Sequence, residues 1–326
     1  MPSVDVPIDQ IRDRVIMRNL PTTEERVWAV LAHLSAIAFG MGILLPVVGW
    51  SEQRRKSNYA SFQSLQALGY QSLGYTIWLL TVLIVAMFSS LGAVAGIMNA
   101  ANPEEQVMAV VLGHTALLFG FTGVYFILPV IGAVFCALGK DFRYPIMGNR
   151  LARYLDYEFL QIGDEQIWLN EAHEDRWVVA MGHFSIIIAL WGILIPLTAW
   201  ILQGKRSLFL KFQAIQTLVF QLGVMLLYFV AGAVYLFGFF SLLITVGLGQ
   251  AESFDSSGGV LGLAILLVSS VVAVLIVLII PLFHIWGQWA GYRVLKGDNY
   301  RYALIGRLVE KRMAGKVNSA VEERAV

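Results

Sequence analysis

Charge is scarce in this sequence of 326 residues: only 14% are Asp, Glu, Lys or Arg, whereas 58% are hydrophobic. A soluble globular chain has about 25% charged residues. The 23 basic and 22 acidic residues almost cancel, so the chain offers no large basic surface for nucleic acid. Its single cysteine, Cys136, excludes an intramolecular disulfide and a zinc site made of several cysteines. These shortages exclude most soluble classes and indicate an integral membrane protein.

The hydrophobic residues are gathered in long runs without charge. A helix needs about 20 apolar residues to cross the hydrocarbon core of a bilayer. Six runs are long enough, and they cover 27–50, 62–98, 107–138, 177–203, 212–249 and 260–289. The charged residues lie between these runs, as the cost of inserting charge into lipid requires. A proton relay through a carboxylate inside a span is therefore not expected.

The second half of the chain repeats the first. Identical residues recur at an offset of 150 positions, among them His33 and His183, Ser35 and Ser185, Gly42 and Gly192, Pro46 and Pro196, Trp50 and Trp200, Gln63 and Gln213, Gln66 and Gln216, and Gln71 and Gln221. Chance does not explain shared polar residues at one offset, so the chain is a tandem duplication. The predicted parts are a polar N-terminal segment (1–25), repeat 1 (26–155), an acidic linker (156–175), repeat 2 (176–312) and a tail (313–326).

The distribution of Lys and Arg predicts how the repeats sit in the membrane. The loops 99–106 and 250–259 contain no basic residue. If 27–50 and 177–203 each enter and leave on one side, every basic residue lies on one face, as the positive-inside rule favours. Gly42 with Pro46, and Gly192 with Pro196, offer the turn. A single tilted helix with a proline kink is the alternative.

The predicted fold is therefore an all-α, polytopic membrane helix bundle of two tandem parallel repeats. Each repeat has a short helical hairpin, two long transmembrane helices and an interfacial tail. We expect the protein in the bacterial cytoplasmic (inner) membrane with both termini in the cytoplasm.

Three histidines are the candidate cofactor ligands: His33, His183 and His284. An imidazole can bind a haem iron or another metal. The alternative is that each histidine hydrogen-bonds between helices and fixes their packing. Because no metal-binding spacing such as H-x-x-x-H occurs, we expect packing, no metal and no cofactor, with haem as the alternative.

Other polar residues recur near the same predicted membrane edge. Gln63 and Gln66 share a helix face, and they either hold the structure together or line a cavity. The polar candidates are Gln63, Gln66, Gln71, Gln213, Gln216, Gln221, Ser35 and Ser185. The predicted interfacial basic residues are Arg54, Arg55, Lys56, Lys205, Arg206, Arg143 and Arg301. Trp28, Trp50, Trp177 and Trp200 are expected to be interfacial anchors.

The sequence resembles a small bacterial membrane family of unknown function. The resemblance lies in Ala32-His33-Leu34-Ser35, Pro46, Trp50, the Phe62-x-x-x-Gln66-Ala67-Leu68-x-x-Gln71 segment and Phe142-Arg143-Tyr144-Pro145. That family is considered related to the twenty-kilodalton channel-like subunit of the chloroplast inner-envelope import translocon. The resemblance implies units with both ends on the cytoplasmic or stromal side. Members often have His where Gln63 and Gln213 stand here, and Ala303 replaces the proline found at Pro145.

No catalytic motif occurs in a fitting context. The sequence therefore predicts a non-catalytic membrane protein, a scaffold or accessory subunit of a membrane complex. A channel or translocation component is the alternative, and a haem-binding subunit is a third. The expected partners are the lipid bilayer and other membrane-protein subunits, with no nucleic acid.

Overall fold

The computed structural model describes residues 20–98, 102–159, 168–248 and 257–314. Parts of the N-terminal segment, of the acidic linker (Asp164 and Glu165 included) and of the C-terminal tail lie outside these ranges. Within them the chain is helical and has no strand, which confirms the all-α class. The chain divides into two compact units, 1–211 and 212–326, so unit 1 contains repeat 1 and the hairpin of repeat 2.

The first apolar run folds into a helical hairpin. Helix α2 (Thr23–Leu34) begins with a capping box between Thr22 and Glu25, the 3-10 segment η1 (Ser35–Ile43) contains the turn, and α3 (Leu44–Gln53) returns. Phe39 leaves the helical region, with φ 49° and ψ −138°. Gln53 Nε2 lies 3.5 Å from Glu24 Oε1, whereas 29 residues of straight helix would separate them by about 43 Å. The hairpin prediction is confirmed, and the tilted-helix alternative is wrong for this segment.

A glycine makes each turn possible. A Cβ on Gly42 would lie 1.7 Å from the carbonyl oxygen of Ser35. The second hairpin consists of α8 (Glu171–Phe184), η3 (Ser185–Ile193) and α9 (Leu194–Gln203). Its Gly192 is also in close contact with Ser185, since a Cβ there would lie 2.1 Å from the carbonyl oxygen. Both predicted turn glycines therefore lie where two backbone segments meet, and Pro46 and Pro196 follow within α3 and α9.

The two hairpins lie the same way up in unit 1. At the turns, a Cβ on Gly40 would lie 2.6 Å from Trp191 of the second hairpin. At the other end, Gln203 Nε2 donates to the hydroxyl of Ser51 at 2.6 Å. The two turns thus contact each other, and so do the C-terminal ends of α3 and α9. This relation is expected of parallel rather than inverted repeats.

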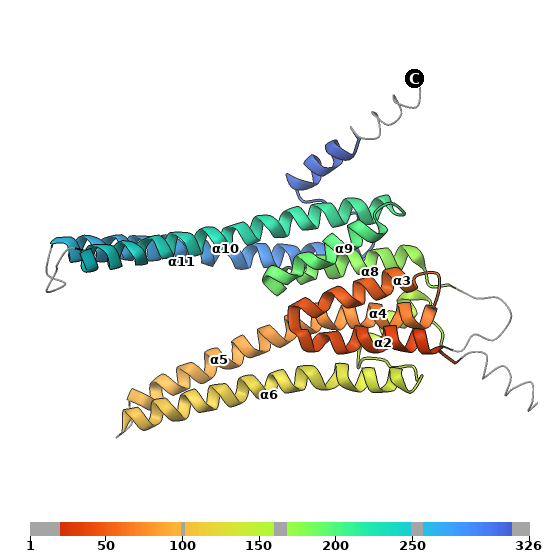
Figure 1. Ribbon diagram of the computed structural model, residues 1–326, viewed down its shortest axis with the longest axis horizontal. Coiled ribbons are helices and arrows are strands. Elements are labelled where there is room, and N and C mark those ends of the chain that lie inside the picture. The colour runs from red at the N-terminus through yellow and green to blue at the C-terminus, as the bar shows by residue number, and fades with distance from the viewer. Residues whose placement is uncertain (1–19, 99–101, 160–167, 249–256, 315–326) are drawn as a thin grey trace, which may run out of the picture. The chain divides into compact units, whose positions relative to one another are not determined.

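One long helix of repeat 1 begins among the hairpins of unit 1 and continues into a segment long enough to cross a membrane. It consists of α4 (Asn58–Gly69), the π-helical η2 (Tyr70–Gly74) and α5 (Tyr75–Met98). Every residue of α4 except Asn58 is buried, whereas no residue of α5 is. Helix α6 (Pro103–Ala137) lies beside α5 and continues along α2 (Figure 1). Twenty-four residues of α5 measure about 36 Å, which is long enough to cross a hydrocarbon core of about 30 Å.

Two further long helices form most of unit 2. Helices α10 (Leu208–Leu248) and α11 (Ser257–Leu295) lie side by side (Figure 1). They approach closely at small residues, since a Cβ on Gly238 would lie 2.7 Å from Ser269 Cβ. In the described part of the chain, five helical stretches, one of them the first hairpin, are long and apolar enough to cross a membrane. The protein is therefore an integral membrane helix bundle.

Candidate functional site

Two glutamines of α4 hold the tail of repeat 1. Gln66 Nε2 donates to the carbonyl of Phe142 at 2.8 Å, and Gln66 Oε1 accepts from the backbone N–H of Tyr144 at 2.9 Å. Gln63 Nε2 donates to the same Phe142 carbonyl at 3.1 Å. A buried backbone segment without strand or helix partners needs such bonds. We call Gln63, Gln66, Phe142 and Tyr144 the tail clamp of repeat 1.

His33 completes the tail clamp. The hydroxyl of Tyr144 lies 2.9 Å from His33 Nδ1, and His33 Nε2 lies 3.0 Å from Gln63 Oε1. Since Gln63 Oε1 can only accept, Nε2 carries the proton and Nδ1 accepts from Tyr144. The imidazole is fully buried and both ring nitrogens are engaged. A haem iron at His33 would have to displace Tyr144 or Gln63.

Asp141 is a clamp residue that the sequence reasoning missed. Its carboxylate accepts from Gln63 Nε2 at 3.1 Å, from the hydroxyl of Tyr157 at 3.2 Å and from Arg143 Nε at 2.9 Å. Burial raises the pKa of Asp141, while Arg143 opposes the shift. The repeat contained the signal, because Asp141 precedes Phe142-Arg143-Tyr144 as Asn299 precedes Tyr300-Arg301-Tyr302.

Repeat 2 builds the glutamine part of this clamp inside unit 2. Gln216 Nε2 donates to the carbonyl of Tyr300 at 2.8 Å, and its Oε1 accepts from the N–H of Tyr302 at 3.3 Å. Gln213 Nε2 donates to Asn299 Oδ1 at 2.7 Å. The predicted glutamine pairs of both repeats therefore hold tails rather than facing an open cavity.

Gln71 and Ser35 meet at the end of α2. Gln71 Nε2 donates to the carbonyl of Ala32 at 3.1 Å and to Ser35 Oγ at 2.9 Å. The last carbonyls of a helix have no partner within it. Gln71 therefore caps α2 where the chain enters its turn.

Arg54 is buried, which corrects its prediction as an interfacial residue. Its Nε lies 3.0 Å from Glu174 Oε2, and its Nη1 lies 2.8 Å from Asp175 Oδ1. Trp50 Nε1 also donates to Glu174, at 3.2 Å. Burial raises the pKa of Glu174 to about 7, with Arg54 opposing. One guanidinium faces two buried carboxylates, so this acidic cluster joins α3 to α8.

Two of the four tryptophans predicted as interfacial anchors are also buried. Trp50 is 0% exposed and lies under the Arg54 guanidinium, and Trp177 is 7% exposed. Trp177 Nε1 donates to the carbonyl of Leu65 at 2.9 Å. Their indoles fix the hairpins to their neighbours, whereas Trp200 is 37% exposed.

The remaining predicted residues are spread over both units. His183, Ser185 and Gln221 are buried. His284 Nε2 lies 3.3 Å from the hydroxyl of Tyr228. Arg143 pairs with Asp141, and Arg301 pairs with Glu310 at 2.9 Å.

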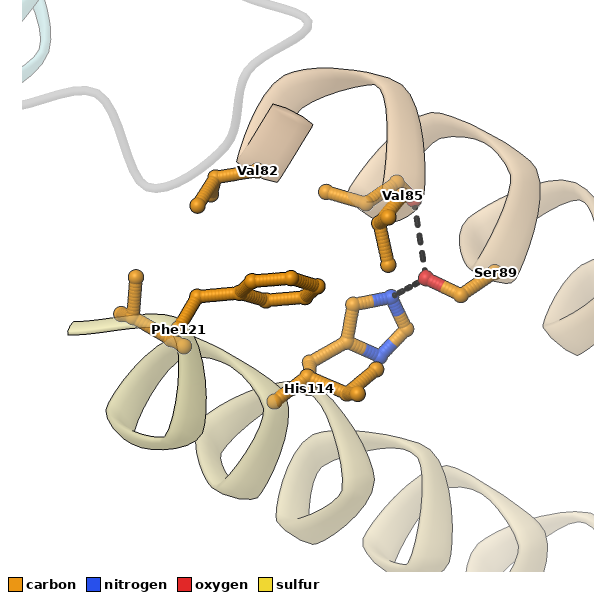
Figure 2. Close-up of a pocket in the computed structure, with 8 residues that line it drawn as sticks. Val82, Val85, Ser89, His114 and Phe121 are labelled. Atoms are coloured by element: carbon orange, nitrogen blue, oxygen red, sulfur yellow. Dashed lines mark hydrogen bonds between the residues drawn. The ribbon is translucent and has the colours of Figure 1, made fainter. Parts of the chain in front are cut away.

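A small cavity of about 180 Å³ lies between α5 and α6. Figure 2 shows Val82, Val85 and Phe121 around it, with His114 at one side. His114 Nε2 lies 2.8 Å from Ser89 Oγ, and Nδ1 lies 2.8 Å from the carbonyl of Val110. Since that carbonyl accepts, Nδ1 carries the proton and Nε2 accepts from Ser89. The cavity wall is thus apolar except for one satisfied histidine–serine pair.

The described residues contain no group of three or more His, Cys, Asp or Glu side chains placed to hold a metal ion. The polar groups that they do bring together are bonded mainly to backbone, to one another or to a single arginine. What this arrangement can do chemically is to hold helices and tails in place.

Comparison with known proteins places this architecture in a family. The model of the magnetosome magnetite crystal formation protein family matches residues 24–151 and again residues 174–309. These segments correspond to the two repeats. No curated protein and no solved structure matches the chain. Because the family model covers most of its length, the chain belongs to the MamF/MmsF family of magnetosome magnetite crystal formation proteins and carries two tandem units of it.

Proposed function

We propose that this protein is a non-catalytic scaffold or accessory subunit of a membrane complex. The observation that carries the proposal is the use of polar side chains. In both repeats the predicted glutamines hold the tail through backbone carbonyl and N–H groups. These buried polar groups therefore hold the tails in place, and this use favours a structural role over a reactive centre.

The apolar outer surface supplies the means of assembly. No residue of α5 is buried in its own unit, and its side chains Ile77, Phe88 and Leu91 are more than 60% exposed. Lipid can cover such a face, and so can helices of other subunits, which pack through van der Waals contact in a bilayer. The family description mentions magnetite crystal formation in magnetosomes. We extend that setting to this chain: its complex acts in a bacterial membrane on whose cytoplasmic side both termini lie.

Crosslinking in the native membrane followed by purification in mild detergent tests the scaffold role. We expect one or more membrane proteins to be recovered in fixed ratio with the tagged chain. A polytopic protein of the same membrane with the same tag is the control. Recovery of the chain alone, with and without crosslinker, would contradict the proposal.

A channel or translocation component is the second candidate. The hydroxyl oxygens of Ser61, Ser64 and Ser72 are buried on the long helix and have no hydrogen-bond partner among the described residues. Buried polar groups of this kind commonly bind water, and a row of them favours a polar path. The bacterial family that the sequence resembles is considered related to a channel-like subunit of the chloroplast import translocon, and this relation would favour the same role. Vesicles containing the purified chain should then conduct ions, and Ser64→Ala should change the conductance. Vesicles that show no conductance would contradict this candidate.

A further inference from the structure

The duplication produced two basic turns at one edge of unit 1. The first follows α3 and contains Arg54, Arg55 and Lys56; the second follows α9 and contains Lys205 and Arg206. The hydrogen bond from Gln203 to Ser51 joins the two helix ends. At the offset of 150, Arg55 corresponds to Lys205 and Lys56 to Arg206. The two turns are therefore matched in sequence and place.

Acidic residues neutralise the first turn. Arg54 is buried against Glu174 and Asp175. Arg55 binds Glu171 through two nitrogens, at 2.5 and 2.8 Å. Lys56 Nζ lies 3.5 Å from Glu52. Each of its three cations therefore has a carboxylate of the protein within 4 Å.

The second turn lacks these acids. Lys205 and Arg206 are exposed, and neither forms an ion pair within the described residues. Where repeat 1 has Glu52, repeat 2 has Leu202, and where it has Arg54, repeat 2 has Gly204. Arg206 contributes to lowering the pKa of Glu171, but the carboxylate of Glu171 is held by Arg55. Two uncompensated positive charges therefore lie side by side.

Exposed apolar side chains flank these charges. Ile201 is 63% exposed and Leu208 is 73% exposed, one on each side of the turn, and Trp200 is 37% exposed. In a membrane protein such side chains face the acyl chains, while Trp and basic residues next to them lie at headgroup depth. A soluble phosphate would make no use of this apolar flank, whereas a phospholipid offers both a phosphate and acyl chains.

We infer that the second basic turn is a binding site for the phosphate of anionic phospholipids, with Lys205 and Arg206 as its cationic ligands, and that the matched first turn is not. Basic residues next to an anionic leaflet each add measurably to lipid attraction. The first turn thus joins the hairpins through its ion pairs, and the second exposes its cations to the lipid surface.

The test compares lipid preference among charge variants of the purified full-length chain. Delipidated protein is titrated with phosphatidylglycerol or phosphatidylcholine, and bound lipid is counted by native mass spectrometry. Lys205→Gln with Arg206→Gln should reduce the preference for phosphatidylglycerol about thirtyfold, as expected for two interfacial charges. Lys205→Arg with Arg206→Lys should retain it. Both pairs of changes are at exposed positions without ion pairs, so the melting temperature should not move.

The first turn supplies matched controls. Lys56→Gln with Glu52→Gln removes an ion pair without changing net charge, and the lipid preference should stay at the wild-type value. Glu52→Gln with Glu171→Gln frees Lys56 and Arg55, and the preference should rise. Equal losses in Lys205→Gln/Arg206→Gln and Lys56→Gln/Glu52→Gln would overturn the proposal. So would full competition by millimolar inorganic phosphate, because the site would then recognise the free anion.

Discussion

An added methyl group at Gly42 would lie within the van der Waals surface of the Ser35 carbonyl oxygen. The clash is with backbone, so relief requires the hairpin turn to open. Gly42→Ala should therefore lower the free energy of unfolding by about 3 kcal/mol, the upper end of overpacking costs. Thermal unfolding in detergent measures the change. Gly120→Ala on α6 is the control, since its Cβ would meet nothing within 4 Å. If Gly42→Ala unfolded at the same temperature as the wild-type protein, the tight turn would be contradicted.

The tail clamp gives a second prediction at the scale of single residues. Gln66→Ala leaves the buried N–H of Tyr144 without its 2.9 Å acceptor and removes a donor to Phe142. An unsatisfied buried backbone group costs about 1–3 kcal/mol, and we expect a loss of about 3 kcal/mol. Gln216→Ala should behave alike in repeat 2. Thr122→Val, which removes only a bond to its own helix at Leu118, should change stability by under about 0.5 kcal/mol.

The sequence groups these glutamines on one helix face but does not identify their partners. Gln63 and Gln66 share a face because they are three residues apart, and this spacing is local. Phe142 and Tyr144 lie more than 75 residues later along the chain, and no periodicity connects them. Arg54 shows the same limit. It stands beside Arg55 and Lys56 in one basic run, and only the fold brings Glu174 and Asp175 to it.

At the scale of elements, the hairpin and the kinked helix were both consistent with the sequence. Gly42 permits either a turn or a bend, and Pro46 fits the first turn of a new helix as well as a kink. The decision rests on Phe39, a non-glycine residue at φ 49°, and no propensity predicts that conformation. The long charge-free helices, in contrast, follow from composition alone.

The acidic cluster between α3 and α8 predicts a pH dependence. Because the pKa of Glu174 is about 7 in the folded protein against an ordinary 4.5, folding takes up a proton between these values. The free energy of unfolding therefore falls as pH rises from about 4.5 to 7, by about 3 kcal/mol at 1.36 kcal/mol per pKa unit. Asp141, whose pKa is also raised, makes the free energy of unfolding fall with rising pH as well, but at lower pH. Glu171, whose pKa is lowered by Arg55, makes it rise with pH.

Substitution separates Glu174 from the other carboxylates. Glu174→Gln keeps an oxygen for Trp50 Nε1 and removes the titrating group, so the slope of stability between pH 5 and 7 should largely disappear. Glu52→Gln, which changes only the exposed pair with Lys56, should keep the wild-type slope. Unfolding midpoints measured across this pH interval decide the matter, and an unchanged slope in Glu174→Gln would place the titrating group elsewhere.

At the scale of the whole molecule, repeat and compact unit do not share a boundary. The family units end and begin between residues 151 and 174, whereas the compact units divide at Lys211. The reason is that the second hairpin packs on the first, through Ser51 and Gln203 at one end and Gly40 and Trp191 at the other. Duplication therefore produced a paired hairpin core rather than two separate copies side by side.

This paired core predicts the topology of the chain in the membrane. If both hairpins return to their starting side, the turns after α3 and α9 face one compartment and the loop before α6 faces the other. Cysteines at Lys56 and Lys205, both exposed, and at Asn102, also exposed, report these positions in a Cys136→Ser background; Cys136 itself is buried.

A membrane-impermeant thiol reagent applied to sealed right-side-out vesicles should label the cysteine at position 102 and neither of the others. In inverted vesicles, positions 56 and 205 should be labelled together and position 102 protected, because the positive-inside rule retains Lys and Arg in the cytoplasm. Permeabilised vesicles, in which all three must react, control for access. Labelling of positions 56 and 205 from opposite sides would mean that the chain crosses the membrane an odd number of times between them, which two hairpins lying the same way up do not allow.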